Sequence, residues 1–118
     1  MKTILLVLAF LSGLATQALA DQPGECLLRV EGKVYMQGPC TYSFEYGVYV
    51  MMNRTWTVYV YTNEDGTAEG NWNAQQEVDK NGRARYVPIS RAHAPLPDLK
   101  QQGSCFKSRS TEICVWSR

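Results

Sequence analysis

The sequence predicts an all-β fold, a small antiparallel sandwich or open barrel of about seven or eight short strands. No segment shows helical periodicity over ten residues. Runs of β-branched and aromatic residues instead alternate with polar residues, and glycine, proline or asparagine turns separate these runs. Four cysteines bracket two of the expected hairpins. Together these observations predict one disulfide-stabilised β domain.

Residues 1–20 have the three-part pattern of a secretory signal peptide. Lys2 supplies a positive charge, Ile4–Leu11 is apolar, and Ala18-Leu-Ala20 offers a small-residue cleavage site. The apolar run is too short for a membrane span, and no later segment is long and apolar enough. We therefore expect export to the periplasm and a single domain over residues 21–118 that has no membrane span.

The first predicted hairpin surrounds Glu31-Gly32. Residues 26–30 and 33–36 alternate apolar with polar side chains, and an x-Gly dipeptide between such runs is typical of a two-residue turn. Gly38-Pro39 is expected to end the second strand.

Further strands follow along the chain. They are expected at Tyr42–Met52, Trp56–Thr62, Thr67–Asn73 and Arg83–Ile89. Gly47 should break the first of these into a bent strand or two short ones, and Gly70 should allow a bulge or close approach. Asn63–Gly66 is a turn sequence. We expect a polar loop, with at most a helical turn, at 75–82 and an irregular proline-rich crossing at 90–99.

The last hairpin is the most strongly specified. A tight loop at Ser108–Thr111 places three pairs opposite one another: Cys105 with Cys114, Phe106 with Ile113, and Lys107 with Glu112. These are a disulfide-compatible pair, an aromatic–aliphatic pair and an opposite-charge pair, so all three agree on one register.

Four cysteines allow three pairings. We favour Cys26–Cys40 and Cys105–Cys114, because each pair is local and fits a predicted hairpin. The alternative is a metal site, but spacings of fourteen and nine residues are unlike the short spacings of zinc ligands, and export favours oxidation. We expect no bound metal and no cofactor.

The charge balance excludes some partners. Without Lys2, eleven lysines and arginines face eleven aspartates and glutamates, so the expected exported domain is neutral. Binders of nucleic acid or anionic membranes normally carry a basic excess. We therefore expect no nucleic-acid partner.

The sequence offers no recognisable catalytic set. His93 is the only histidine, and in its proline-rich segment we expect it to brace backbone carbonyls rather than to serve a catalytic triad. Glu64, Asp65 and Glu69 are the densest acidic group, but the first two lie in a turn where solvation is the simpler role. A small hydrolase is thus the least favoured function, and we expect no enzyme.

Two basic groups and the aromatic residues are candidate surfaces. Arg83, Arg85 and Arg91 form one basic group, and Lys107 with Arg109 forms the other at the tip of the last hairpin. Each is either a solvated surface that guards against edge pairing or a docking surface for an acidic cleft. Three tryptophans and seven tyrosines should mostly fill the core, and exposed ones could stack on sugars.

Residues at both ends of the expected domain carry a resemblance to a known family. They are Cys26-Leu-Leu-Arg-Val-Glu-Gly-Lys-Val-Tyr35, Gly38-Pro39-Cys40, Ala92-His93-Ala94-Pro95-Leu96, Leu99, Gly103-Ser-Cys105 and Ile113-Cys-Val-Trp116. In these stretches the chain resembles small exported proteins of alphaproteobacteria, among them a periplasmic peptidoglycan hydrolase inhibitor of Brucella. Pro97 and Phe106 depart from the glycine and tryptophan expected in such sequences.

The resemblance implies inhibition of a lysozyme-like peptidoglycan hydrolase, a muramidase. It fixes no inhibitory residue. The residues themselves suggest Lys107, Ser108, Arg109 and Ser110, because this loop combines cations with hydroxyls and is anchored by a disulfide at its base. The alternative is a cell-envelope or glycan-binding structural protein that inhibits no enzyme.

Overall fold

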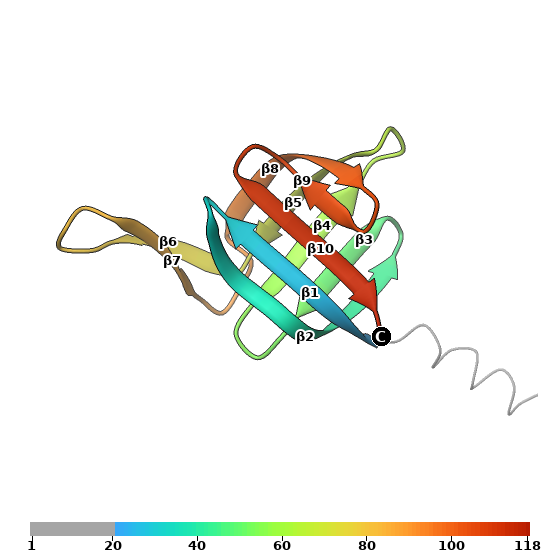
Figure 1. The fold of residues 1–118 in the computed structure, drawn as a ribbon, viewed down its shortest axis with the longest axis horizontal. Coiled ribbons are helices and arrows are strands. Elements are labelled where there is room, and N and C mark those ends of the chain that lie inside the picture. The colour runs from blue at the N-terminus through green and yellow to red at the C-terminus, as the bar shows by residue number, and fades with distance from the viewer. Residues whose placement is uncertain (1–20) are drawn as a thin grey trace, which may run out of the picture.

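The computed structural model describes residues 21–118, so the predicted signal peptide at 1–20 lies outside the described residues. Within that range eight strands form a closed antiparallel barrel in the order β1-β10-β9-β8-β5-β4-β3-β2, and β6 and β7 form a separate hairpin (Figure 1). The strands are β1 (Gln22–Val30), β2 (Lys33–Glu45), β3 (Val48–Met52), β4 (Thr57–Thr62), β5 (Thr67–Trp72), β6 (Ala74–Val78), β7 (Ala84–Pro88), β8 (Ala94–Gln102), β9 (Cys105–Lys107) and β10 (Thr111–Ser117). The predicted all-β class is confirmed, and the barrel is closed. No helix among residues 21–118 is long and apolar enough to cross a bilayer.

The β1–β2 and β2–β3 hairpins turn on two residues each. In the first, Glu31 and Gly32 have φ angles of 54° and 81°, and in the second, Tyr46 and Gly47 have φ angles of 52° and 78°. Two consecutive residues with positive φ are the requirement of a type I′ turn, whose twist matches that of paired strands. The turn at Gly47 therefore divides residues 42–52 between β2 and β3. Of the two expectations, one bent strand or two separate strands, the second is confirmed.

Strand β2 does not end at Gly38-Pro39, as the sequence had suggested, but continues to Glu45. The reason is that β3 pairs with β2 only from Thr41 onward, so one edge of β2 has no partner at Pro39. A proline is tolerated in a strand where its missing N–H would meet no partner.

The expectation of an irregular segment at 90–99 is also wrong from Ala94 onward, where β8 begins. Pro95 lies opposite Asn71 of β5, while β9 pairs with β8 only from Lys100. The edge of β8 that has no neighbour before Lys100 accommodates Pro95 and Pro97, as the free edge of β2 accommodates Pro39. The β5–β8 register shifts between Ala68 and Gly70, which confirms the predicted bulge.

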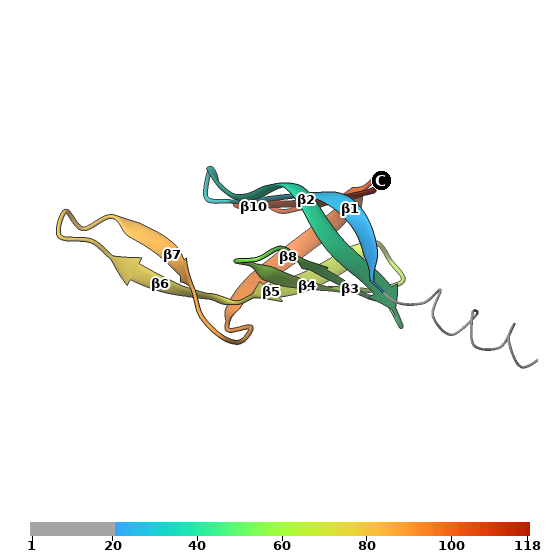
Figure 2. The ribbon, with the colours of Figure 1, turned by 90° about the horizontal axis from the view of Figure 1, so that it is seen from below.

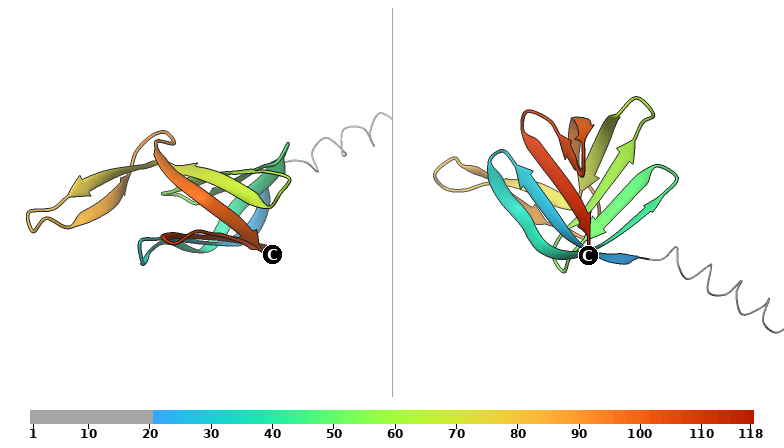
Figure 3. Two further views of the ribbon diagram at one scale, coloured as in Figure 1. Left: turned by 90° about the horizontal axis from the view of Figure 1, so that it is seen from above. Right: turned by 45° about the vertical axis from the view of Figure 1, so that its right-hand side comes forward.

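Of residues 75–82, which were expected to form a polar loop, 75–78 instead belong to strand β6 (Ala74–Val78). They pair with β7 from Ala74↔Pro88 to Val78↔Ala84. This hairpin projects away from the barrel (Figures 2 and 3), and four of the five β6 residues are exposed. Its polarity therefore reflects exposure on both faces and not the absence of a strand.

Alternating side chains fill the barrel. In β1, Cys26, Leu28 and Val30 are buried, whereas the intervening Leu27 and Arg29 are not. The largest fully buried side chains are Trp72, Phe106, Leu28, Met51, Leu99, Ile113, Val58, Val60 and Cys114. Burial of these groups supplies the main driving force for folding.

An aromatic cluster lies where the β6–β7 hairpin leaves the barrel. The ring of Tyr35 contacts Trp56, Trp72 and Tyr86 edge-on, at centroid distances of 5.5, 4.9 and 6.0 Å. Burial raises the pKa of Tyr86 above its ordinary value, and the negative charge of Glu31 adds to this effect. The cluster anchors the base of the hairpin to the barrel.

The two predicted disulfides are confirmed. Cys26–Cys40 joins β1 to β2 within the core cluster, and its Cα atoms are 5.8 Å apart. Cys105–Cys114 joins directly opposed residues of β9 and β10, with Cα atoms 4.0 Å apart. Because the bonds use all four cysteines, no thiolate is available as a metal ligand.

Phe106 and Phe44 should contribute very differently to the free energy of unfolding, because only Phe106 lies in the core. Phe106 is 2% exposed and Phe44 is 52% exposed. Phe106→Ala should lower the free energy of unfolding by about 3–5 kcal/mol through lost burial and a residual cavity. Phe44→Ala should cost about 1.5 kcal/mol or less. Urea unfolding with the disulfides intact measures both, and equal losses would contradict this assignment of the core.

Candidate functional site

The candidate site is the β9–β10 loop and its surroundings. Strand β10 pairs with β9 on one side and with β1 on the other. The β9–β10 register is the predicted one: Glu112 opposite Lys107, Ile113 opposite Phe106, and Cys114 opposite Cys105. The disulfide thus closes the base of a loop whose two ends are also held by the barrel.

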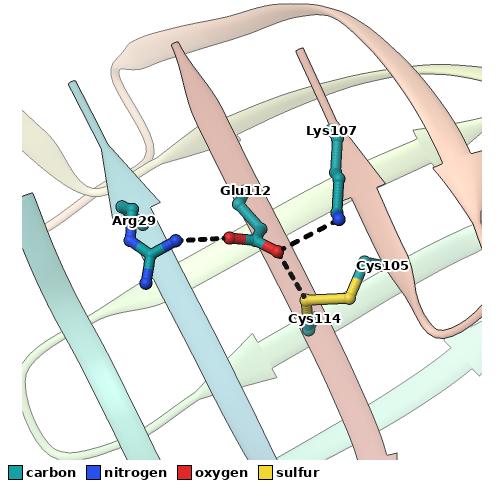
Figure 4. Close-up of a disulfide and its surroundings, with 5 residues drawn as sticks. All are labelled: Arg29, Cys105, Lys107, Glu112 and Cys114. Atoms are coloured by element: carbon teal, nitrogen blue, oxygen red, sulfur yellow. Dashed lines mark hydrogen bonds and ion pairs between the residues drawn. A yellow bond between two sulfur atoms is a disulfide. The ribbon is translucent and has the colours of Figure 1, made fainter. Parts of the chain in front are cut away.

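Glu112 lies between two cations (Figure 4). Its Oε1 is 2.7 Å from Nη1 of Arg29, and its Oε2 is 3.4 Å from Nζ of Lys107. Cys114 Sγ lies 3.9 Å from the same Oε2. That approach is a contact and not a hydrogen bond, because a disulfide sulfur has no proton to donate. The carboxylate compensates part of the positive charge and fixes both side chains over β10.

The loop itself is ordered by one serine. The Ser108 hydroxyl oxygen accepts hydrogen bonds from the backbone N–H groups of Ser110 at 3.3 Å and Thr111 at 3.1 Å. The Ser108 N–H donates to the Thr111 carbonyl at 2.9 Å. The Ser110 carbonyl accepts from the N–H of Glu31 at 2.6 Å, which ties the loop to the β1–β2 turn. The loop is therefore held from within and from a neighbouring turn.

A surface hollow of about 290 Å³ lies beside this loop. It is lined by Arg29, Gly32, Lys107, Ser108, Arg109, Ser110, Thr111 and Glu112. Three positive charges face one negative charge, so the hollow carries a local excess of +2. Arg109 is exposed and forms no ion pair within residues 21–118. The hollow is thus suited to an anionic group, and a carboxylate is the simplest that fits.

The structure gives the four predicted partner-binding residues different roles. Arg109 and Ser110 are exposed at the tip, Lys107 is half-buried and already paired, and the oxygen of Ser108 is used by the turn. Sequence reasoning missed Arg29, which reaches the site only because β1 pairs with β10. The only indication in the sequence was the opposite charge of Arg29 and Glu112. Because these residues lie on the first and last strands, the sequence alone does not show that they are neighbours.

The other candidates for chemistry do not assemble into a catalytic set in the described part of the chain. His93 is exposed, and its backbone N–H donates to the Trp72 carbonyl at 2.9 Å. The predicted imidazole bond to a backbone carbonyl is not among the hydrogen bonds of residues 21–118. Asp65 accepts from the hydroxyl of Thr67 at 2.6 Å and from its N–H at 3.0 Å. These bonds, the hydroxyl's first, lower the pKa of Asp65, so this carboxylate organises the β4–β5 turn.

The remaining basic and aromatic candidates lie on other surfaces. Arg85 is 3.5 Å from Glu77 across the β6–β7 hairpin. Trp56 and Trp72 are core residues, whereas Trp116 is 43% exposed. The rings of Tyr59 and Tyr61 lie nearly parallel, 14° apart with centroids separated by 6.4 Å.

No protein-family model, no curated protein and no solved structure matches the chain. What the site can do must therefore be argued from its own geometry.

The turn geometry predicts unequal roles for the two loop serines. Ser108→Ala should lower the free energy of unfolding by about 1–2 kcal/mol, because two backbone N–H groups lose their acceptor. Ser110→Ala, whose hydroxyl touches only Thr111 at 3.4 Å, should change it by about 0.5 kcal/mol or less. Urea unfolding measures both, and hydrogen exchange at Thr111 reports the turn directly. Equal effects would show that the Ser108 oxygen does not order the loop.

Proposed function

We propose that this protein is exported to the periplasm and inhibits a peptidoglycan hydrolase of the lysozyme-like muramidase type. Inhibition would occur by docking the loop 107–110 into the enzyme's cleft. The observation that supports the proposal best is the basic hollow, which is lined by three cations, two serine hydroxyls and one carboxylate. The resemblance of both ends of the domain to exported alphaproteobacterial proteins supports the same function.

The chemistry of such enzymes suits the hollow. Glycoside hydrolases place two carboxyl groups across the scissile bond, so their clefts are acidic at the centre. An exposed guanidinium beside hydroxyl donors would pair with a carboxylate in a water-poor cleft, and Arg is well suited to bidentate pairing. Arg109 is the cation with no internal partner in the described residues, so it is the group that would enter.

The rigidity of the loop also supports the proposal. Association costs the ordering of loops and side chains, and a pre-ordered loop avoids that cost. Here the Cys105–Cys114 bond, the Ser108 turn and the Glu31–Ser110 hydrogen bond order the loop before any partner arrives. Closely stapled loops also resist proteolysis, which an exported protein must survive.

Charge reversal at the tip tests inhibition. Arg109→Glu should raise the inhibition constant against a sensitive muramidase by about 10-fold or more, since a hydrogen bond to a charged group is worth about 1.5–3 kcal/mol. The measurement is the rate of turbidity loss of cell walls at several inhibitor concentrations. Arg83→Glu, at an exposed arginine near β7, is the matched control and should inhibit as the unaltered protein does.

Two outcomes would reject this proposal in different ways. Absence of inhibition by the unaltered protein against every muramidase tested would remove the function itself. Full inhibition by both Arg109→Glu and the Ser108→Ala/Arg109→Ala double variant would keep the function but remove this loop as its site.

A second candidate function is glycan binding without inhibition. It is favoured by Tyr59 and Tyr61, which lie two residues apart on β4, stack at 14°, and leave Tyr61 44% exposed. Val50 and Val48 of β3 lie directly opposite them. Exposed aromatic rings of this kind can stack on the apolar faces of sugars.

A pull-down with purified peptidoglycan separates the two functions. If glycan binding is correct, Tyr59→Ala/Tyr61→Ala should release most of the bound protein, whereas Tyr46→Ala, which is 99% exposed at a turn, should not. Arg109→Glu should leave glycan binding unchanged. Equal retention of all variants would exclude the tyrosine pair as the binding surface.

A further inference from the structure

The barrel opens into a second hollow at the end of β10 that carries the C-terminus (Figure 1). Its volume is about 340 Å³, and it is lined by residues of β2, β3, β10 and the β8–β9 turn: Tyr42, Tyr49, Ser104, Val115, Trp116 and Ser117. Strands β3 and β10 are not neighbours in the barrel, so a hollow that touches both spans its mouth. Mouths of β-barrels are common ligand sites, and small-molecule pockets measure about 300–1,000 Å³.

The wall formed by β2 and β3 is aromatic. Tyr42 lies directly opposite the buried Met51, and opposed residues share one face of a sheet, so Tyr42 is on the inner face. Tyr49 also faces inward, because the centroid of its ring is 5.6 Å from that of the buried Phe106. The exposed Phe44 packs on Tyr49 with ring centroids 4.3 Å apart, and it extends this wall to the rim.

Gly24 of β1 leaves the space in which the Tyr42 ring lies. A side-chain carbon at this position would lie 2.8 Å from Cδ1 of Tyr42 and 2.7 Å from the carbonyl oxygen of Trp116, which is too close for either atom. The hydroxyl of Tyr42 also donates to Oε1 of Gln22 at 3.4 Å. Strand β1 therefore positions the ring before any ligand binds, which lowers the ordering cost of binding.

The other wall carries hydroxyl groups. Val115 and Ser117 follow the buried Ile113 at intervals of two along β10, so they face inward, whereas Trp116 faces outward. The N–H of Val115 donates to the carbonyl of Ser104 at 3.1 Å, which places Ser104 beside this strand. The hydroxyls of Ser104 and Ser117 form no hydrogen bond within residues 21–118, so both can bind a ligand.

The hollow differs in charge from the other hollows of residues 21–118. No charged side chain of that range lines it, whereas the basic hollow and three further hollows each include at least one. A charged ligand would lose hydration here without gaining a partner of opposite charge. The site therefore favours an uncharged ligand that combines an apolar face with hydroxyl groups.

We infer that the barrel mouth binds one uncharged pyranose ring, either as a free sugar or as a unit of a neutral glycan. A pyranose presents C–H groups on one face and hydroxyls around its edge, and these match an aromatic wall opposed by serine hydroxyls. This site is separate from the Tyr59–Tyr61 pair, which lies on the outer face of β4 because the alternating Val58 and Val60 are buried. It also does not depend on inhibition of a muramidase.

A sugar titration followed by NMR of the backbone amides tests the site on the unaltered protein with both disulfides formed. The probes are N-acetylglucosamine, glucose and glucuronate. At least one of the two neutral sugars should shift the signals of Tyr42, Ser104 and Ser117 and leave those of Tyr59 and Tyr61 unchanged. Glucuronate, which adds a carboxylate to the glucose ring, should bind about fivefold more weakly than the neutral sugar or worse.

Two variants test the two walls separately. Tyr42→Ala removes part of the aromatic wall and should weaken sugar binding about fivefold or more. The Ser104→Ala/Ser117→Ala double variant changes only exposed positions, so it should fold normally and weaken binding by about the same factor through lost hydrogen bonds. Tyr59→Ala/Tyr61→Ala is the matched control and should bind the sugar as the unaltered protein does.

Three results would each overturn the inference. The first is the absence of signal shifts at the barrel mouth with both neutral sugars, including the case in which only Tyr59 and Tyr61 respond. The second is binding of glucuronate as tight as that of glucose or tighter. The third is unchanged sugar binding by both the Tyr42 variant and the double serine variant.

Discussion

The pairing of β10 between β1 and β9 is the constraint on which the rest of the structure depends. It closes the barrel by joining the first described strand to the last, with seven residue pairs from Gly24↔Ser117 to Val30↔Thr111. Contacts this distant in sequence cost loop-closure entropy before they contribute any stability. The two disulfides reduce that cost, because each fixes one local hairpin, β1–β2 or β9–β10, that β1–β10 pairing then unites.

The candidate site is a consequence of the same pairing. Without β1 beside β10, Glu112 would face Lys107 alone and would lack its ion pair with Arg29 (Figure 4). The loop would also lack the hydrogen bond from the N–H of Glu31. With β1 in place, one carboxylate holds two cations, and a third cation, Arg109, stays exposed. The positive excess of the hollow is therefore built by tertiary structure, although the protein that follows the predicted signal peptide has no net charge.

Local features were predictable from the sequence, and non-local ones were not. The β9–β10 register followed from three facing pairs, and both disulfides followed from hairpin geometry. The errors arose where the structural role of a residue depends on neighbours that are distant in the sequence. Pro39 was expected to end a strand, and Pro95 to belong to an irregular segment, because the sequence cannot show that the strand edge beside each proline has no partner. Arg29 was missed for the same reason, since its partner Glu112 lies 83 residues away.

The distribution of edge protection links the fold to function. Closing the barrel removes most free strand edges. Two stretches of the barrel still have a strand edge without a neighbour, and each contains a proline, Pro39 in β2 and Pro95 in β8. Strand β7 is protected in the same way by Pro88 and by the hydroxyl of Tyr35. Strand β6 has no such device, although it is the most exposed strand described. A rigid, charged surface is therefore found at the β9–β10 end, whereas the projecting hairpin carries most of its side chains in solvent.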